Sequence, residues 1–177
     1  MLKYAGPANR RCAALITLGA LAALLAGCGK SRSDQDPHAK GPVVTCNLRC
    51  EWTAEGLMAN LAFQNVSDGE VAILQRNLLI GDDAGELTWS PFEITRRGAR
   101  IPYNGKVVKQ PAPTNADYRV LAPGEVVNAT VNVGSAYDVS PPGVYRVRYA
   151  SVNFSRDGNE RIDIASNTVE VLNSASR

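Results

Sequence analysis

The sequence predicts an all-β fold, an antiparallel β-sandwich of about eight strands. Valine, isoleucine and threonine are frequent, apolar and polar residues alternate along short runs, and turns rich in Gly or Pro separate these runs at regular intervals. No part of the domain shows a convincing amphipathic helical pattern. Because each alternating strand has one apolar face, such strands bury their apolar faces best between two packed sheets.

The expected strands follow one another from residue 43 onward. The pair Asp68-Gly69 marks a turn after the second of them. The strongest pattern lies towards the C-terminus, where Tyr145, Val147 and Tyr149 share one face of an extended run. The predicted strands cover residues 43–52, 56–65, 71–80, 87–95, 100–108, 118–121, 126–133, 144–154 and 162–172.

Residues 1–27 resemble the signal peptide of a bacterial lipoprotein. Lys3, Arg10 and Arg11 form a basic start, and residues 13–26 form a short apolar core. This core is shorter than the ~20 residues that a membrane-spanning helix needs. We therefore expect cleavage after residue 27; an ordinary signal peptide and a single membrane anchor are the alternatives.

Cys28 follows Leu25-Ala26-Gly27, an order similar to the lipobox of bacterial lipoproteins. This resemblance implies that the Cys28 thiol is diacylated and that the lipid anchors the chain to a membrane. Residue 29 is Gly29 and not aspartate, which by similarity to Gram-negative sorting favours the outer membrane facing the periplasm. A Gram-positive host remains an alternative. Residues 28–42 are polar and are expected to form a flexible tether, followed by the β-sandwich domain at 43–174.

The charge balance argues against a nucleic-acid partner. The whole chain has 19 basic and 17 acidic residues. Removal of residues 1–27 takes away three basic residues and no acidic one, which leaves a formal charge of −1. The slight basicity of the precursor therefore belongs to its signal, and no basic patch of the kind that binds nucleic acid remains.

Cys46 and Cys50 are the two cysteines with no role in targeting. They lie on the same face of the first predicted strand, where four strand steps span ~13 Å. Bonded cysteines have Cα atoms within ~7 Å of each other, so a disulfide requires a turn or bulge at residues 47–49. A disulfide and two buried thiols are both open. A metal site is a weaker third alternative, because the single histidine, His38, lies in the tether.

A tyrosine near the start of the strongest strand suggests the kind of sandwich. Pro142-Gly143-Val144-Tyr145 is similar to the tyrosine corner of immunoglobulin-like domains, in which a phenol hydroxyl binds the backbone of the preceding crossover. Tyr145 is the candidate for this role. The alternative is an ordinary core or surface tyrosine.

An ordered set of short motifs extends through the middle and end of the domain. It resembles the non-catalytic N-terminal β-domain that precedes the zinc peptidase domain in deuterolysin-like, peptidyl-lysine metalloendopeptidases. The sequence departs from that pattern around residues 74–81. The motifs are Phe92-Glu-Ile-Thr, Arg97-Gly98, Ile101-Pro-Tyr-Asn-Gly105, Lys109-Gln-Pro-Ala-Pro113, Asp117-Tyr118, Leu121-Ala-Pro-Gly-Glu125, Tyr137-Asp-Val-Ser140, Gly143-Val-Tyr-Arg-Val-Arg-Tyr149 and Ser166-Asn-Thr-Val169.

The catalytic residues of that family are not expected in this chain. Its peptidases need His-Glu-x-x-His, with two imidazoles for zinc and a glutamate as base. Here there is one histidine, and the chain ends where the peptidase domain would begin. The same shortage of histidine argues against a Ser-His-Asp triad. We therefore expect a protein that is not an enzyme and that uses no cofactor, and a protease label given by similarity alone would not describe its chemistry.

A cluster of acidic residues is a weak candidate for a cation site. Asp82, Asp83 and Glu86 lie close together in a loop that contains glycine. Calcium binds such oxygens, but their spacing does not match an EF-hand loop. A solvated acidic turn is the favoured interpretation.

The loop at residues 103–118 is the best candidate for partner binding. It combines Lys106 and Lys109 with flanking Tyr103 and Tyr118, and two prolines, 111 and 113, restrain it. Prolines lower the entropic cost of presenting a loop, and tyrosines are favoured interface anchors. The alternative is a crossover between the sheets whose tyrosines pack on the sandwich.

These features favour a binding module of the cell envelope with a protein partner, for which a peptidase is the candidate. Within this hypothesis the domain acts as an inhibitor, chaperone or detached pro-domain of a metalloendopeptidase. The alternative is a structural or adhesive envelope component that binds carbohydrate or surface proteins. That alternative would gain support if Trp52 and Trp89 faced outward as an aromatic platform.

Overall fold

A computed structural model describes residues 41–80 and 85–174. The predicted signal peptide, Cys28, most of the tether and the residues Asp82 and Asp83 lie outside the described residues. Within the described part of the chain, no helix is long and apolar enough to cross a membrane.

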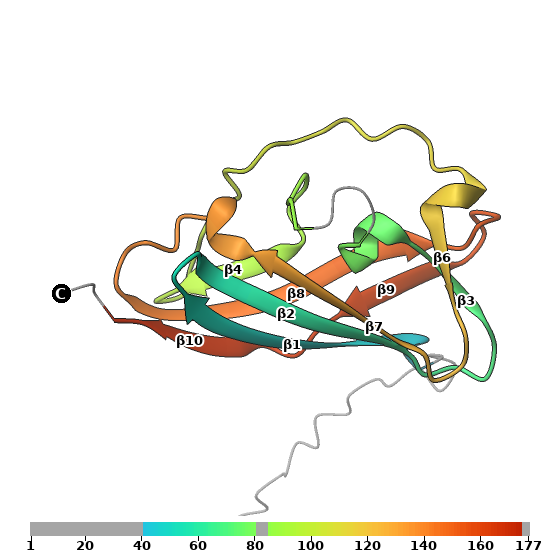
Figure 1. Cartoon of the computed structure of the whole chain (residues 1–177), viewed down its shortest axis with the longest axis horizontal. Helices are drawn as coiled ribbons and strands as arrows, with labels where there is room; N and C mark the ends of the chain where they lie inside the picture. Colours follow the sequence, from blue (N-terminus) through green and yellow to red (C-terminus); the bar gives the residue numbers. More distant parts are fainter. Residues whose placement is uncertain (1–40, 81–84, 175–177) are drawn as a thin grey trace, which may run out of the picture. The chain divides into compact units, whose positions relative to one another are not determined.

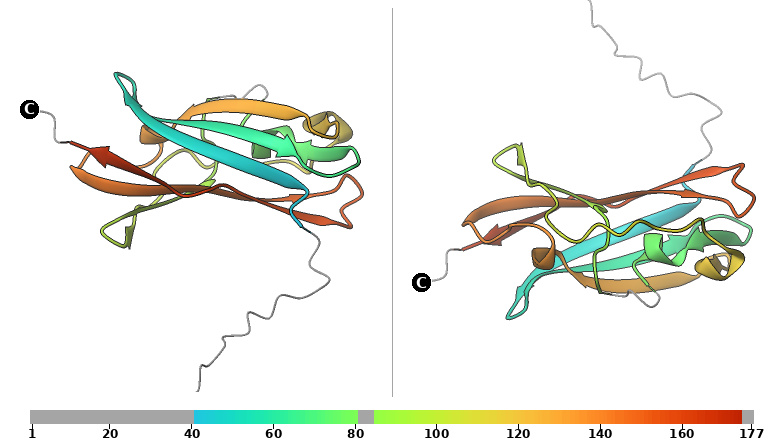
Figure 2. Two further views of the ribbon diagram at one scale, coloured as in Figure 1. Left: turned by 90° about the horizontal axis from the view of Figure 1, so that it is seen from below. Right: turned by 90° about the horizontal axis from the view of Figure 1, so that it is seen from above.

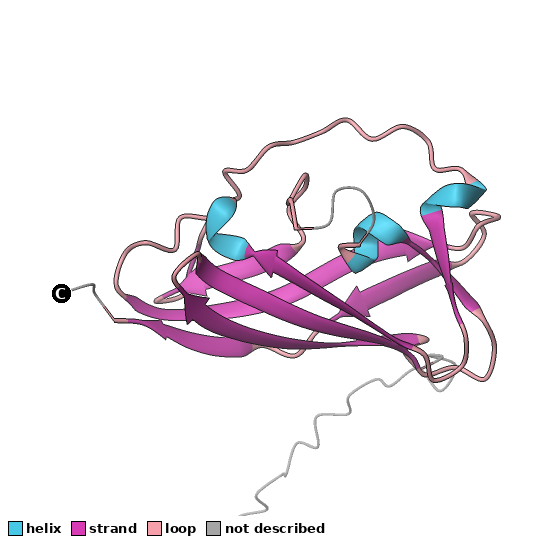
Figure 3. Ribbon diagram, viewed as in Figure 1, coloured by secondary structure: helices cyan, strands magenta, loops and turns pink. Residues whose placement is uncertain are grey.

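The regular structure of the described chain is almost entirely strands in antiparallel sheets, which confirms the all-β prediction (Figure 3). The described residues form ten strands, one more than the nine predicted runs, because the run at 162–172 is divided into two strands. Three short 3-10 turns connect them: η1 (Gln75–Leu78), η2 (Asn115–Asp117) and η3 (Val133–Ser135). The strands are β1 (Val44–Thr53), β2 (Gly56–Asn65), β3 (Val71–Leu74), β4 (Phe92–Arg96), β5 (Ala99–Arg100), β6 (Tyr118–Leu121), β7 (Val126–Asn132), β8 (Gly143–Phe154), β9 (Arg161–Ala165) and β10 (Val169–Asn173).

Two sheets pack face to face as an immunoglobulin-like β-sandwich (Figure 2). One sheet has the order β1-β2-β7, and the other has the order β10-β8-β4-β5, with β9 also paired to β8. Between them lies an aromatic core in which Phe63 of the first sheet meets Tyr149 of the second, with ring centroids 5.4 Å apart. Phe92 contacts the same Tyr149 ring at 5.7 Å. The alternation read from the sequence therefore places these side chains in the interior.

A buried asparagine stabilises the place where the chain leaves the first sheet and forms a smaller, two-stranded sheet. Asn65 is fully buried at the end of β2, and its side-chain Nδ2 donates to the carbonyl oxygens of Gly69 and Leu121 at 2.8 and 2.9 Å. Its backbone exchanges hydrogen bonds with Gly124 and Glu125. These bonds tie the β2–β3 turn to the β6–β7 turn, so that β3 and β6 form their own antiparallel pair (Figure 1).

A second asparagine joins the two layers at the edge of β1. The Asn167 side chain accepts a hydrogen bond from the backbone N–H of Leu48 at 2.8 Å and donates to its C=O at 3.0 Å. The backbone N–H of Tyr149 donates to the Ser166 hydroxyl at 2.9 Å. Two separate strands, β9 and β10, therefore pair with β8. The sequence had predicted one continuous strand over residues 162–172. Side-chain amides that cover a strand edge also block unwanted pairing with another chain.

Three predicted strands are shorter than expected. The predicted strand at 71–80 ends at Leu74, and the chain continues as η1. The cause is Asn77, whose side chain turns inward and hydrogen-bonds to residues of β8. Asn77 is buried, donates through Nδ2 to Val152 O and Asn153 Oδ1, and accepts a hydrogen bond from the Tyr149 hydroxyl. Leu79 then adopts φ 54°, a left-handed conformation that leaves the strand direction.

The other two shortened strands contain proline. The run at 87–95 forms a strand only after Pro91, and the run at 100–108 loses its pairing after Pro102 except for one bridge between Tyr103 and Tyr137. Proline has no N–H to give to a ladder, so it is poorly tolerated inside a sheet. Residues 101–117 form a long connection from β5 to β6, and this connection carries the candidate site.

Candidate functional site

The first end of the long connection is fixed to the sandwich through Tyr103. The Tyr103 hydroxyl lies 2.6 Å from Leu87 O and 2.7 Å from Lys106 O, and its ring meets Tyr137 edge to face at 5.4 Å. Burial raises the pKa of Tyr103 and of Tyr137, so both phenols stay protonated and able to donate at neutral pH. Tyr103 therefore packs as the crossover alternative predicted.

The second end of the connection is fixed by the η2 turn. Asp117 Oδ2 accepts hydrogen bonds from the Thr114 backbone N–H at 2.6 Å and from the Thr114 hydroxyl at 2.8 Å, a capping box. These two bonds lower the pKa of the Asp117 carboxyl. Gln75 Nε2 donates to Ala116 O at 3.0 Å, and Tyr118 lies under the Arg156 guanidinium at 5.9 Å.

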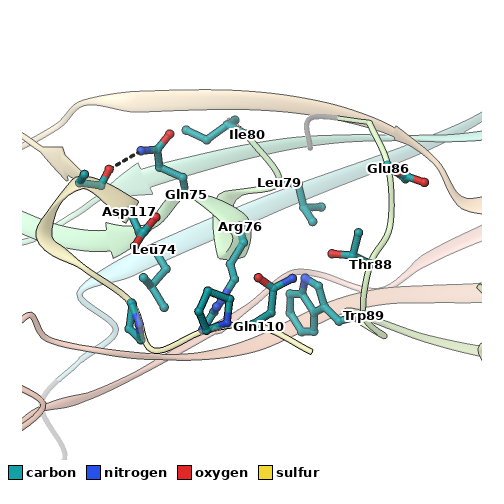
Figure 4. Close-up of a pocket in the computed structure, with 13 residues that line it drawn as sticks. Leu74, Gln75, Arg76, Leu79, Ile80, Glu86, Thr88, Trp89, Gln110 and Asp117 are labelled. Atoms are coloured by element: carbon teal, nitrogen blue, oxygen red, sulfur yellow. Dashed lines mark hydrogen bonds between the residues drawn. The ribbon is translucent and has the colours of Figure 1, made fainter. Parts of the chain in front are cut away.

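A cavity of about 400 Å³ lies between this connection and the sandwich (Figure 4). We call residues 109–117 the strap, because they cross over the cavity between the two fixed ends. The volume is within the ~300–1,000 Å³ range of known ligand sites. The lining comes from three segments: Leu74, Gln75, Arg76, Leu79 and Ile80 beneath; Glu86, Thr88 and Trp89 at one side; and Gln110, Pro111, Pro113, Ala116 and Asp117 of the strap.

The cavity has mixed chemistry that suits a peptide better than an apolar ligand. Arg76 and Trp89 lie on either side of Gln110 in Figure 4 and are both half-buried. Arg76 makes no ion pair with another described residue. Glu86 is exposed at the rim. A guanidinium, a carboxylate, an amide and an indole together offer donors, acceptors and an apolar surface to an extended chain.

None of the four predicted loop residues lines this cavity. Lys106 and Lys109 are exposed and do not line it, and Tyr103 and Tyr118 are half-buried against the sandwich. Sequence reasoning missed Arg76, and it included Gln110 in the predicted loop without giving it a role. Arg76 lies in the stretch that departs from the resembled pattern, so this departure was the available signal.

Both remaining cysteines are free thiols on a straight strand. Cys46 is buried and Cys50 is half-buried. In the antiparallel ladder with β2, Cys46 lies opposite Phe63 and Cys50 lies opposite Ala59. The strand has no turn or bulge at residues 47–49. Of the two alternatives, a disulfide and two free thiols, the structure therefore has two free thiols. Burial raises the pKa of Cys46 to about 12 and of Cys50 to about 11. Neither thiol is therefore ionised at neutral pH, which argues against a nucleophile or metal ligand.

Tyr145 occupies the position expected of a tyrosine corner. Its side chain is fully buried, and its hydroxyl donates to Pro141 O, four residues earlier, at 2.5 Å. The Arg96 guanidinium lies over the ring at 5.8 Å. This bond holds the crossover from β7 to β8 against the sandwich.

The two tryptophans do not form an exposed row. Trp52 packs against the core, and its Nε1 is buried without a hydrogen-bond partner. Trp89 lines the cavity beneath the strap. A carbohydrate platform built on these two rings is therefore absent from the described residues.

The fold and the covered cavity define an immunoglobulin-like sandwich with a cavity beneath the strap. Within residues 41–80 and 85–174, no group of three or more His, Cys, Asp or Glu side chains converges to hold a metal. No family model matches the chain. The chain is 28% identical over 108 residues to an extracellular protease of Aeromonas hydrophila, a match that covers 61% of this chain and 30% of that protein. The similarity supports a link to peptidases, and the matched part spans less than a third of the relative.

Proposed function

We propose that this protein is a non-catalytic envelope lipoprotein whose β-sandwich binds a peptidase related to the Aeromonas hydrophila extracellular protease. The supporting observation is the extent of the match. Only 40 residues precede the described sandwich, so more than half of the 108 matched residues fall after residue 40. A segment that makes up 30% of the relative is smaller than a whole protease. The shared part is therefore a candidate for an accessory domain.

The strap is the surface proposed to contact the peptidase. Every residue from 111 to 117 is exposed, while both ends of the connection are fixed by the bonds described above. Pro111 and Pro113 restrict the backbone between these ends. A restrained, exposed segment loses little conformational entropy on binding, which favours an inhibitor or pro-domain role over a purely structural one.

The proposed function includes no catalytic step by this chain. The chain has one histidine, His38, in the predicted tether, and it has no His-Glu-x-x-His motif. Zinc-dependent hydrolysis in the resembled family depends on that motif. The protein would act on peptide hydrolysis only through its partner, as an inhibitor, a chaperone or a detached pro-domain.

The test is to mix the purified mature domain with a lysine-specific metalloendopeptidase of the resembled class. We expect a complex at micromolar concentration, with either inhibition of peptide cleavage or a higher yield of refolded peptidase. The absence of both a complex and any effect on activity or refolding would refute the proposal. Lys109→Glu, at the start of the strap, should weaken the complex, whereas Glu55→Lys in the exposed β1–β2 turn is the matched control and should not.

A further inference from the structure

The outer face of the β1-β2-β7 sheet carries an unusual set of polar residues. Its outward positions alternate with the buried ones, and asparagine occupies four of them: Asn47, Asn60, Asn128 and Asn132. Asparagine is depleted in strands, and other polar residues with a higher strand propensity, such as threonine, would serve equally well on a face that only contacts water. Asn60 and Asn132 hydrogen-bond within the protein, so Asn47 and Asn128 are the two whose presence a structural role leaves unexplained, and a functional reason is expected for them.

The centre of this face is hollow because the middle strand has a small residue there. Ala62 of β2 lies opposite Asn47 of β1 on one side and Asn128 of β7 on the other. The next row across the sheet is Arg49, Asn60 and Thr130. Together these residues line a shallow depression of about 280 Å³, which we call the amide dish. Its volume is just below the ~300–1,000 Å³ range of known ligand sites and suits one ring-sized group.

Part of the dish is held in place by hydrogen bonds within the protein. Thr130 Oγ1 donates to Asn60 Oδ1 at 2.8 Å, and Asn60 Nδ2 donates to Glu51 Oε1 at 3.0 Å. This chain fixes the orientation of the Asn60 amide from both sides. The floor of the dish is therefore preorganised, which lowers the cost of binding.

The two flanking amides are available to a ligand. The side chains of Asn47 and Asn128 are exposed and make no hydrogen bond to another described residue, and the Arg49 guanidinium forms no ion pair among them. Opposed strand positions two strands apart lie ~10 Å from each other, so the two amides flank Ala62 on the exposed face with room for a single ring between them. Each amide offers both donors and an acceptor in one plane.

We propose that the amide dish binds a sugar ring of an oligosaccharide. Neighbouring hydroxyls on such a ring each donate and accept, which matches the paired donor and acceptor groups of Asn47 and Asn128. The dish has no aromatic ring for stacking, so a Kd on the order of 1 mM is expected for a short oligosaccharide. This function is separate from peptidase binding, because the dish lies on the outer face of the sheet and shares no lining residue with the strap cavity.

The experiment is an NMR titration of the mature domain with chitotriose and, separately, with maltotriose to about 10 mM, ten times the expected Kd. We expect saturable shifts of the side-chain amide signals of Asn47 and Asn128 with at least one sugar. No shift with either sugar would overturn the proposal. Sodium acetate is the control for anion binding at Arg49, and equal shifts with acetate alone would likewise overturn the sugar assignment.

Substitution within the dish separates binding from folding. Ala62→Leu fills the depression on the exposed face and should abolish the shifts while the thermal unfolding midpoint stays within a few degrees. Thr45→Leu, on the same face of β1 but outside the dish, should leave sugar binding unchanged. Asn128→Ala should weaken binding at least several-fold. Full binding by both Ala62→Leu and Asn128→Ala would show that the sugar binds elsewhere. Peptidase binding should be unaffected by either variant, so failure here leaves the strap proposal standing.

Discussion

At the residue scale, single hydrogen bonds from buried side chains hold the irregular parts of this sandwich. Asn65, Asn77 and Asn167 each use their amide to satisfy backbone groups that no strand ladder reaches. A buried polar group without a partner costs about 1–3 kcal/mol, so each of these bonds matters more than a surface contact. Tyr145 has the same role for the crossover before β8.

The Tyr145 bond can be measured by removing the hydroxyl alone. Tyr145→Phe keeps the ring in the core but leaves the Pro141 carbonyl without its donor. We expect the free energy of unfolding, measured by urea denaturation, to fall by about 1–2 kcal/mol with an unchanged m-value. Tyr118→Phe is the matched control, because the Tyr118 hydroxyl makes no hydrogen bond to another described residue. Equal stability of the two variants would remove Tyr145 from this role.

The state of Cys46 and Cys50 is a second prediction at this scale. Both are free in the structure, and burial raises the pKa of each to about 11 or 12. At pH 8 a thiol-specific reagent should therefore react slowly with the folded mature domain and should titrate two thiols rapidly in urea. The Cys46→Ser and Cys50→Ser variants should each show one thiol in urea. If the wild-type domain shows no thiol in urea until a reductant is added, the cysteines are bonded.

At the element scale, the sequence predicted the long strands and misjudged the segments around the site. Strands β1, β2 and β8 follow their alternation closely, because one face of each is buried along its length. The run at 71–80 is apolar enough to resemble a strand, but the buried Asn77 turns it into η1. Its partners, Val152 and Asn153, lie 75 or more residues away, so a local pattern contains no sign of them.

The same limit applies to the candidate sites. The prolines and tyrosines of the connection at 103–118 marked it as unusual, and the strap does cover a cavity there. Arg76 and Trp89 enter that cavity from other elements, which only the tertiary fold brings together. In the amide dish, alternation shows that Asn47 and Asn128 point outward. The pairing of β1 and β7 on either side of β2 was needed to place them around Ala62.

The η2 turn that ends the strap should respond to acid. The bonds from Thr114 lower the pKa of Asp117 below its usual value of 3.8. A lowered pKa means that the folded turn favours the carboxylate. The stabilisation is therefore complete above the unfolded value and is lost as the pH falls through the lower folded value. Thr114→Ala removes the hydroxyl bond and keeps the backbone one, so it should raise the Asp117 pKa part of the way towards 3.8, as measured by the carboxyl carbon shift in an NMR titration. It should also speed amide exchange at residue 117.

A matched variant separates this cap from a general effect of acid. Ser140 hydrogen-bonds to Asp138 in a similar local turn outside the strap, and this lowers the Asp138 pKa. Ser140→Ala should raise the pKa of Asp138 and leave Asp117 unchanged. An Asp117 pKa that stays fully low in Thr114→Ala would show that the backbone N–H of residue 114, which still donates to Asp117 Oδ2 in the variant, is sufficient without the hydroxyl.

At the scale of the whole molecule, the proposed lipid anchor limits where a partner can be met. The tether predicted at 28–42 spans at most ~50 Å when fully extended. A peptidase or glycan that contacts the domain would therefore lie close to the membrane surface that holds the lipid. A soluble copy of the domain could meet the same partner anywhere in the compartment, so anchoring would act on the local concentration rather than on the contact itself.

This division of roles predicts the behaviour of a variant without the anchor. Cys28→Ser should abolish incorporation of labelled palmitate and should remove the chain from the membrane fraction, because no thioether to lipid can form. Fusion of residues 41–177 to an ordinary cleavable signal should give a soluble, folded domain with the same affinity for its partner in solution, since this segment includes every strand of the described sandwich. Wild-type protein that carries no palmitate would refute the lipoprotein assignment. A released domain with weaker affinity would instead show that the lipid or tether contributes to the contact.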